Sequence, residues 1–173
     1  MVSLLICASF PAQAQISREY QLKSAFLLNF TQFTDWPTNT FTTSNAPIVI
    51  GIIGTDPFGK ILDDTVRNET VNGRRLVIQR YQRLEDVDAC HVLFIPRSEF
   101  RQLDRIVSGT RSKPILTVSD IEGSASRGVM IHLVTENNKI RIRINTDSVA
   151  EAHLTISSKL LRVAETVPQR SAP

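Results

Sequence analysis

The chain is organised as short apolar runs separated by polar segments with helical spacing. Short, uninterrupted apolar runs are typical of strands that are buried on both faces of a parallel sheet. The segments around them place apolar residues three or four positions apart, which predicts amphipathic helices. Strands are expected at 47–53, 74–81, 91–95 and 114–119, and helices at 17–36, 57–67, 98–108, 147–154 and 157–167. This alternation predicts an α/β fold with a mostly parallel sheet.

The clearest single element is a hairpin in residues 128–145. Two arms of alternating apolar and polar residues flank the polar turn at 136–139, as expected for a pair of antiparallel strands. The hairpin therefore adds a C-terminal antiparallel edge to the sheet. The sequence contains no repeat, low-complexity segment or second core, so residues 15–168 are expected to form one domain and 169–173 a frayed tail.

Composition narrows the class of protein. The chain has 173 residues, of which 42% are hydrophobic and 21% charged, as in an ordinary globular domain. The net charge is +3, and the Lys and Arg residues are scattered along the chain. This balance gives no indication of a nucleic-acid-binding surface.

The N-terminus has the features of a secretory signal peptide. It is apolar from Val2 to Phe10 and ends in an A-x-A pattern at 12–14, although no Lys or Arg precedes Arg18. Cleavage is expected after Ala14, which places the protein outside the cytoplasm. The apolar stretch is too short to span a bilayer. The alternative is a disordered apolar tail.

The two cysteines have different expected fates. Cys7 would leave with the signal peptide, and the residues before it, "LLI", lack the small residue that a lipidated cysteine requires. Cys90 would then be the one cysteine of the mature chain. A single cysteine in an oxidising compartment is either buried and inert or pairs between chains. Burial is favoured because an apolar run, "HVLFI", follows it.

A glycine-containing turn, "GIIGTDPFGK", follows the first predicted strand. It lacks both the G-x-G-x-x-G spacing and the G-K-[ST] ending of phosphate-binding loops. Asp56 followed by Pro57 indicates a helix N-cap with proline at the first helical position. The carboxylate of Asp56 would accept the N–H groups that a phosphate needs. The turn is therefore interpreted as a capped strand-to-helix connection.

A candidate ligand site lies where three predicted strands end. The strand ends near residues 54, 96 and 119 are expected at one edge of the sheet, where ligands of parallel α/β folds bind. The polar residues there suit a small zwitterion, or are simply polar loops with capping side chains. The candidate ligand-binding residues are Thr55, Asp56, Arg97, Ser98, Ser119 and Asp120, with Glu122 beside them.

Catalytic constellations are not evident in the sequence. His91, His132 and His153 are far apart and lack metal-ligand spacing such as H-E-x-x-H. Cys90 and His91 are neighbours on a predicted strand, so their side chains point to opposite faces and cannot form a dyad. The sequence also lacks a G-x-S-x-G motif. We therefore expect no enzyme activity, cofactor or metal.

The second arm of the hairpin, "KIRIRIN", directs isoleucines to one face and Arg141 and Arg143 to the other. Two interpretations stay open. The arginines form a solvated strand face whose charge discourages aggregation, or they form a basic contact surface for an acidic partner.

The chain resembles the YfiR/HmsC family of bacterial periplasmic proteins. The matching segments occur in the order expected for the family and cover residues 19–167. They are "EYQLKSAFLLNFTQFTDWP", "GTDPFGKIL", "VNGRRLVIQR", "CHVLFIPRSE", "PILTVSD", "GVMIHLVTENNKIRIRIN" and "AHLTISSKLLRVA".

The resemblance implies a three-layer α/β/α sandwich, often a homodimer, that regulates rather than catalyses. Better-known members bind the periplasmic sensor domain of an inner-membrane diguanylate cyclase and hold it inactive, which lowers cyclic di-GMP signalling and biofilm formation. The partner surface is expected at Arg141, Arg143 and His153. The alternative is a small-molecule-binding sensor acting on another membrane receptor, such as a histidine kinase. Some members respond to redox state through disulfides, whereas Cys90 has no partner for an intrachain disulfide in the mature chain.

Overall fold

The structure is a computed structural model that describes residues 11–168, with the backbone alone for 11–17. The expected tail at 169–173 and most of the expected signal peptide, residues 1–10, lie outside this range. The expected cleavage point after Ala14 falls within the first helix. Cleavage and the domain boundaries therefore stay predictions.

The centre of the fold is an eight-stranded sheet with the order β10-β8-β7-β6-β5-β2-β4-β3. Its five middle strands run parallel, which confirms the mostly parallel sheet. They are β2 (Ile48–Ile53), β4 (Arg74–Tyr81), β5 (Val92–Ile95), β6 (Leu116–Ser119) and β7 (Ile131–Glu136). The edges carry β8 (Lys139–Ile144), antiparallel to β7, then β10 (Glu165–Thr166), parallel to β8, and on the other side β3 (Thr70–Val71), antiparallel to β4.

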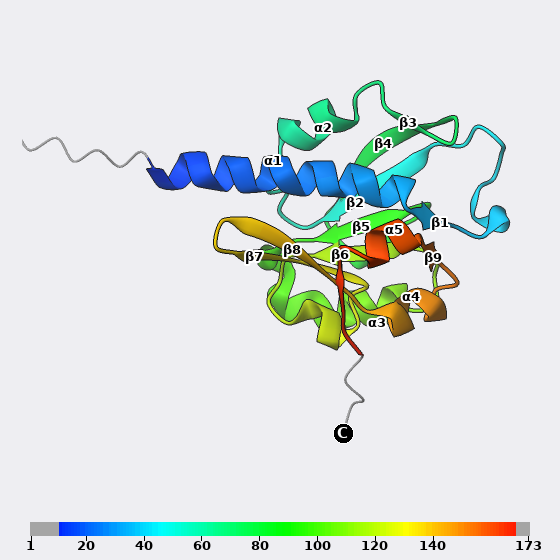
Figure 1. The fold of residues 1–173 in the computed structure, drawn as a ribbon. Coiled ribbons are helices and arrows are strands. Elements are labelled where there is room, and N and C mark those ends of the chain that lie inside the picture. Colours follow the sequence, from blue (N-terminus) through cyan, green and yellow to red (C-terminus); the bar gives the residue numbers. More distant parts are fainter. Residues whose placement is uncertain (1–10, 169–173) are drawn as a thin grey trace, which may run out of the picture.

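Helices cover both faces of this sheet, giving the expected α/β/α layers. Helices α1 (Pro11–Gln32) and α2 (Lys60–Val66) lie together on one face, and α3 (Leu103–Thr110) lies on the other (Figure 1). The remaining helices are α4 (Thr146–Glu151), α5 (Ser158–Leu161) and the 3-10 turns η1 (Thr38–Thr40), η2 (Leu84–Asp86), η3 (Arg97–Gln102) and η4 (Ser124–Arg127).

Two buried clusters explain the apolar runs of the sequence. On one face, Leu27 and Phe30 of α1 pack with Ile50 of β2. On the other face, Leu93 of β5 packs with Ile106 of α3. Because β2 and β5 are covered on both sides, all of their residues are buried. Burying one such side chain contributes roughly 1.5–3 kcal/mol relative to leaving it exposed.

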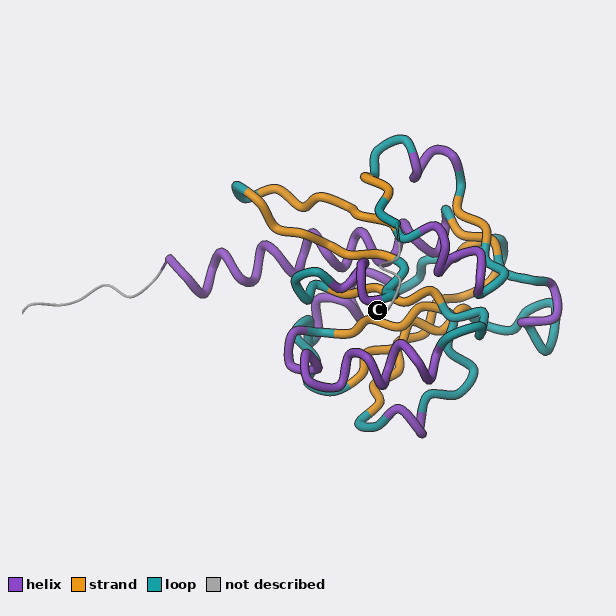
Figure 2. Tube along the Cα trace, turned by 90° about the horizontal axis from the view of Figure 1, so that it is seen from below, coloured by secondary structure: helices purple, strands orange, loops and turns teal. Residues whose placement is uncertain are grey.

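The hairpin of β7 and β8 forms as predicted, with His132 opposite Arg143 and Glu136 opposite Lys139. Its turn residues Asn137 and Asn138 have φ angles of 50° and 59°. A two-residue hairpin turn favours such left-handed conformations, and asparagine tolerates them. Figure 2 shows the hairpin as a long two-stranded arm beside α1.

Several boundaries differ from those predicted at 17–36 and 157–167. Helix α1 begins at Pro11, before the predicted start at residue 17, and ends at Gln32. Residues after it form β1 (Thr34–Asp35), which pairs with β9 (Thr155–Ile156) in a separate two-stranded sheet. The last predicted helix stops at Leu161, because the chain extends to pair β10 with β8. These short strands depend on distant partners, which local periodicity does not reveal.

Candidate functional site

The carboxyl ends of β2, β5 and β6 lie at one edge of the sheet, as the parallel pairing predicts. The chain order reverses there, because β4 follows β2 on one side and β5 joins β2 on the other. In open α/β sheets such a reversal point is the usual position of a ligand site. The loops after Ile53, Ile95 and Ser119 form this edge.

Asp56 does not have the capping role that the sequence predicted. Helix α2 begins at Lys60 with Gly59 at the N-cap position, so Asp56 does not cap the helix. Instead Asp56 Oδ1 accepts the N–H of Phe58 at 2.7 Å, and Asp56 Oδ2 accepts from Arg80 Nε at 2.7 Å. The chain from Asp56 to Gly59 forms a turn between β2 and α2, so Asp56 lies too far ahead of the helix to cap it. Both oxygens of Asp56 therefore serve the fold.

The loop after β5 packs closely against the turn after β2. Gly54 has a φ of +76°, and a Cβ added there would lie 2.0 Å from Glu99 Oε1. Ser98 Oγ donates to the same Glu99 oxygen at 3.1 Å. Glu99 thus lies over the β2 turn, while Thr55 is exposed beside it.

Ser119 is also used inside the fold. Its hydroxyl donates to the Ile95 carbonyl at 2.7 Å and accepts the N–H of Ile121 at 3.0 Å. The side chain is fully buried and joins the ends of β5 and β6. Of the six predicted ligand residues, Arg97 and Asp120 are the two that contact each other, through Arg97 Nε and the Asp120 carbonyl at 3.2 Å. Their binding of a ligand stays a prediction.

Asp120 is the centre of a charged cluster that includes α1. Lys23 Nζ lies 2.6 Å from Asp120 Oδ2 and 2.5 Å from Glu19 Oε1, and Tyr20 donates its hydroxyl to Asp120 Oδ2 at 3.0 Å. Arg97 closes the cluster, 3.7 Å from Glu19 Oε1. The side chains of Lys23 and Asp120 are both 0% exposed. A buried ion pair of this kind ties α1 to the end of β6.

The cluster shifts the pKa values of its members. Burial, together with the charge and hydrogen bond of Asp120, raises the pKa of Tyr20, so the phenol stays protonated. Burial alone would raise the pKa of Glu19. The hydrogen bond and charge of Lys23 outweigh that effect, with help from Thr135 and Arg97, and the pKa of Glu19 is lowered. Glu19 is therefore held as a carboxylate.

The α1 members of the cluster were missed at the sequence level, because they lie about a hundred positions from Asp120 in the chain. One signal was present. Lys23 precedes Leu27 by four positions and Phe30 by seven, so it belongs to the apolar face of the helix. A lysine on that face requires a buried acidic partner.

A surface cavity of about 330 Å³ opens beside the cluster. It is lined by Arg97, Phe100, Asp120, Ile121 and Glu122. Asp120 Oδ1 is buried and has no hydrogen-bond partner, although buried carboxylate oxygens usually have one. Phe100 is 56% exposed, which is high for a large apolar side chain. The cavity thus has an apolar wall and lies next to Asp120, whose side chain is 0% exposed.

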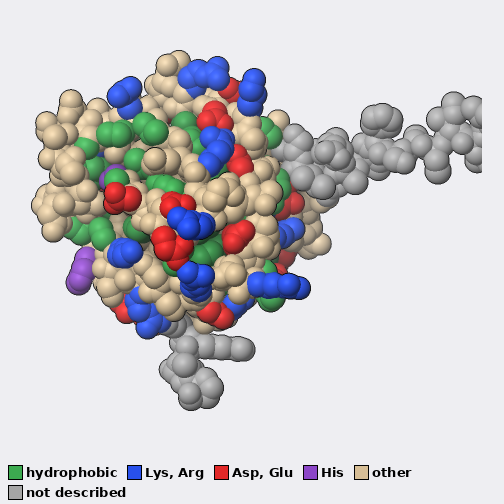
Figure 3. Space-filling view, turned by 180° about the vertical axis from the view of Figure 1, so that it is seen from behind, with side chains coloured by type: hydrophobic (Ala, Val, Ile, Leu, Met, Phe, Trp, Pro, Cys, Tyr) green, Lys and Arg blue, Asp and Glu red, His purple; other side chains and the backbone are tan. Residues whose placement is uncertain are grey.

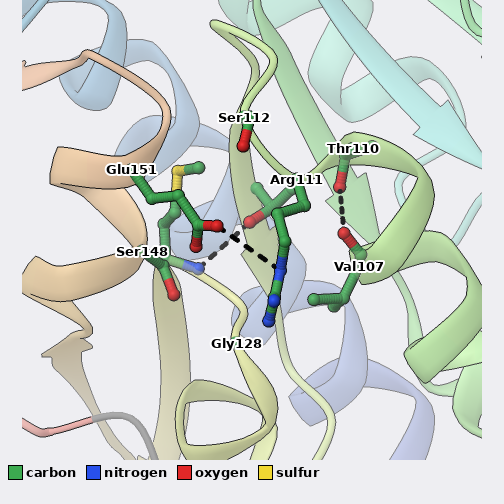
Figure 4. Close-up of a pocket in the computed structure, with 9 residues that line it drawn as sticks. Val107, Thr110, Arg111, Ser112, Gly128, Ser148 and Glu151 are labelled. Atoms are coloured by element: carbon green, nitrogen blue, oxygen red, sulfur yellow. Dashed lines mark hydrogen bonds and ion pairs between the residues drawn. The ribbon is translucent and has the colours of Figure 1, made fainter.

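A second cavity, between α3 and α4, is too small for an organic ligand. Figure 4 shows Arg111 and Glu151 facing each other across it, with 3.7 Å between Arg111 Nε and Glu151 Oε1. Its volume of about 10 Å³ matches roughly one water molecule. We therefore do not regard this cavity as a ligand site.

The predicted partner residues lie on two segments. Arg141 and Arg143 share one face of β8 and both pair with Glu136, at 3.0 and 3.3 Å, and Arg143 also pairs with Glu165 at 3.0 Å. We call these four side chains the arginine ladder. His153 is exposed in the left-handed turn after α4. Acidic and basic side chains are likewise interspersed over the face in Figure 3.

Cys90 and His91 are separated as predicted. Cys90 is 5% exposed, belongs to the cluster beneath α3, and burial raises the pKa of its thiol to about 12. A buried, protonated thiol is unreactive. His91 instead stacks on Phe41, with ring centroids 4.7 Å apart, and burial with the charge of Arg74 lowers its pKa to about 4. Within residues 18–168, no three His, Cys, Asp or Glu side chains gather as a metal site.

One comparison with known proteins gives a match. No helix in the described part of the chain is both long and apolar enough to cross a membrane. A search of curated proteins returns no significant match. A sequence profile described as YfiR/HmsC-like matches residues 20–165, which include the arginine ladder and, apart from Glu19, the charged cluster. The chain therefore belongs to the YfiR/HmsC-like family.

Proposed function

We propose that the protein acts in the periplasm, where it binds the sensor domain of an inner-membrane diguanylate cyclase and holds the cyclase inactive. The observation that carries this proposal is the family match over residues 20–165, since the family suggests a periplasmic regulator of diguanylate cyclase signalling rather than an enzyme. Lower cyclic di-GMP and less biofilm would follow. A homodimer is part of the same proposal.

The arginine ladder and His153 are the proposed contact surface. Arg141 is 63% exposed although it pairs with Glu136. Exposed ion pairs contribute little to stability, so exchanging them for pairs with a partner costs the fold little. Mixed charges of this kind favour orientation and rate of association over raw affinity.

The test is a gene deletion followed by measurement of cellular cyclic di-GMP. We expect cyclic di-GMP to rise on deletion and to return to its original level when a full-length copy is supplied. A copy with Arg141→Glu should restore repression less well than one with Lys113→Glu, a matched charge reversal at an exposed lysine outside the ladder. An unchanged cyclic di-GMP level in the deletion strain, with the cyclase expressed, would contradict the proposal.

A second candidate function is small-molecule sensing. The observation that favours it is the unpartnered Asp120 Oδ1 beside a surface cavity. Asp120 also holds Lys23 of α1, so a ligand at this position would contact the residue that fixes the helix. The two functions are compatible if ligand binding changes the affinity for the membrane partner.

A further inference from the structure

We propose that the outer edge of β4 pairs with the same edge of a second copy of the chain. The two sheets would then join into one continuous sheet across a twofold axis. This inference rests on the homodimer proposed above and gives that dimer a defined interface. Repression of the cyclase is measured separately, so the interface and the proposed function can fail independently.

Strand β4 lies near one edge of the sheet, next to α2 (Figure 1). It pairs with β2 along all of 76–81, whereas β3 covers its other side only at 74–75. No other strand in the described part of the chain pairs with β4. A surface groove of about 470 Å³ is lined by Leu76, Val77 and Ile78 together with the end of α2. The outer side of β4 is therefore open beyond β3.

The main-chain groups along this open side are available to another strand. The carbonyl of Tyr81 accepts the N–H of Gly54 at 2.8 Å, so the main chain of Tyr81 faces the side of β2. Main-chain groups alternate in direction along a strand. Those of Leu76, Ile78 and Arg80 therefore face the open side. A row of unpaired main-chain groups is a template for the addition of a strand.

The two edges of the sheet differ in how well they are protected. At the opposite edge, β8 presents Arg141, which is 63% exposed, and is partly covered by β10. Charged side chains on an edge strand discourage pairing with another chain. On β4, residues 76–79 are all uncharged and Val77 is 38% exposed. The edge of β4 is therefore the one suited to association.

The charges beside this edge favour a second copy over a charged peptide. Arg80 carries no free charge, because it pairs with Asp63 at 2.6 Å and with Asp56 at 2.7 Å. The ionisable residues that line the groove have charges that sum to zero, and they are Asp63, Glu69, Arg67 and Arg75. Two such edges meet without net repulsion, whereas a strongly acidic or basic segment gains no net attraction.

Twofold symmetry fixes the register of the pair. An antiparallel pair centred on Ile78 places that residue opposite its own copy. Leu76 then lies opposite Arg80 of the second copy, and the second copy ends its pairing before β3. Val77 lies opposite Gln79 of the second copy. Each pair of outward-facing residues exchanges two main-chain hydrogen bonds, about six in all. No like charges lie opposite each other in this register.

Analytical ultracentrifugation of the protein purified after secretion tests the pairing. We expect dimers at about 100 µM that dissociate on dilution, because an interface of one edge strand is small. Val77→Lys should weaken dimerisation about tenfold or more, since a lysine within an edge strand discourages pairing. Val163→Lys makes the same change at a valine that is 72% exposed, and this control should dimerise normally.

Two results would overturn the inference. One is a wild type that stays monomeric at about 100 µM, which would leave the edge of β4 to a different chain. The other is a dimer that Val77→Lys does not weaken.

Two further variants test the register. Val77→Lys combined with Gln79→Glu places opposite charges across the interface, and should recover most of the dimer lost in Val77→Lys. Ile78→Cys should form a disulfide with its own copy, because the Cα atoms of a hydrogen-bonded antiparallel pair lie about 5.5 Å apart. Cys90 is buried and does not compete. Neither recovery nor cross-linking would contradict the register.

The outcome for the dimer is separable from the outcome for the proposed function. A monomeric protein that still controls cyclic di-GMP would reject the inference alone. A dimer that Val77→Lys weakens, in a protein without control of cyclic di-GMP, would support the pairing and reject the proposed function.

Discussion

The charged cluster at the end of β6 and the arginine ladder on β8 contain the same kinds of residues in opposite environments. In the cluster, Lys23 and Asp120 are 0% exposed and join two elements far apart in sequence. In the ladder, Arg141 and Glu165 are 63% and 61% exposed and belong to neighbouring strands. The ion pairs are chemically alike, so the difference in burial decides how much each pair contributes to the stability of the fold.

This difference separates the roles of the two regions. A buried pair loses its hydration on folding, so removing one partner leaves an uncompensated charge in the interior. An exposed pair keeps most of its hydration and can exchange partners at little cost. The cluster is therefore suited to fixing α1 on the sheet, and the ladder to meeting another protein. Four substitutions test this contrast.

Lys23→Ala should have the largest effect on stability. It leaves Asp120 buried without its main cation, and the expected loss in the free energy of unfolding is about 3–5 kcal/mol. Urea denaturation of the purified variant measures it. The double variant Lys23→Met with Asp120→Leu removes both charges and should recover most of the loss. A loss below about 1 kcal/mol in the single variant would show that the cluster behaves like a surface pair.

Tyr20→Phe should have a smaller effect. It removes one hydrogen bond to a charged acceptor, Asp120 Oδ2, which is worth about 1.5–3 kcal/mol. Tyr81→Phe is the matched control, because the Tyr81 hydroxyl lies within hydrogen-bond distance of two neutral acceptors, the Gln79 side-chain oxygen and the Asp88 main-chain carbonyl. The control should lose about 0.5–1.5 kcal/mol. Equal losses in the two variants, measured by denaturation, would argue against a special contribution from the cluster.

Glu19 should make the stability of the protein depend on pH in the acidic range. Its pKa is lower in the folded protein than in the unfolded chain. Its contribution is therefore present above the unfolded pKa and is lost as the pH falls through the folded pKa. We expect the wild type to have a higher Tm than Glu19→Gln at neutral pH, and the gap to narrow as the pH falls below 4.5, the ordinary pKa of a glutamate, and through the lowered pKa of the folded protein. Thermal unfolding across that range measures the gap, and a constant gap would contradict this reasoning.

Arg141→Ala should change stability least, by within about 0.5 kcal/mol, because the pair with Glu136 is exposed. The same substitution should still weaken repression of the cyclase if the ladder contacts the partner. Measuring unfolding and cellular cyclic di-GMP on one variant separates the two effects. A marked loss of stability would show that the ladder is structural.

The order of the central elements could be predicted from the sequence because each has a local signal. Strand β4 occupies 74–81 as predicted, and the hairpin turn lies at Asn137 and Asn138. The misplaced features depend on contacts across the fold. Asp56 was expected to cap a helix, but it closes a turn before the helix and is held there by Arg80. Strand β10 forms because it pairs with β8.

The candidate site was predictable in part for the same reason. Parallel strands bring their carboxyl ends together, which places Arg97 and Asp120 at one edge. The sequence pattern did not reveal that the Ser119 hydroxyl would form its hydrogen bonds with main-chain groups of Ile95 and Ile121. The link to Lys23 also required knowing where α1 crosses the sheet. The lysine on an apolar helix face was the visible signal, and its partner was not.

The most direct test of the central claim is cellular cyclic di-GMP in a deletion strain that carries one of two copies. One copy is the full chain, and the other begins at residue 15 and so lacks the expected signal peptide. We predict that the full chain lowers cyclic di-GMP and that the shortened chain, expressed at an equal level, does not. Equal repression by both copies would contradict a regulator that acts from the periplasm.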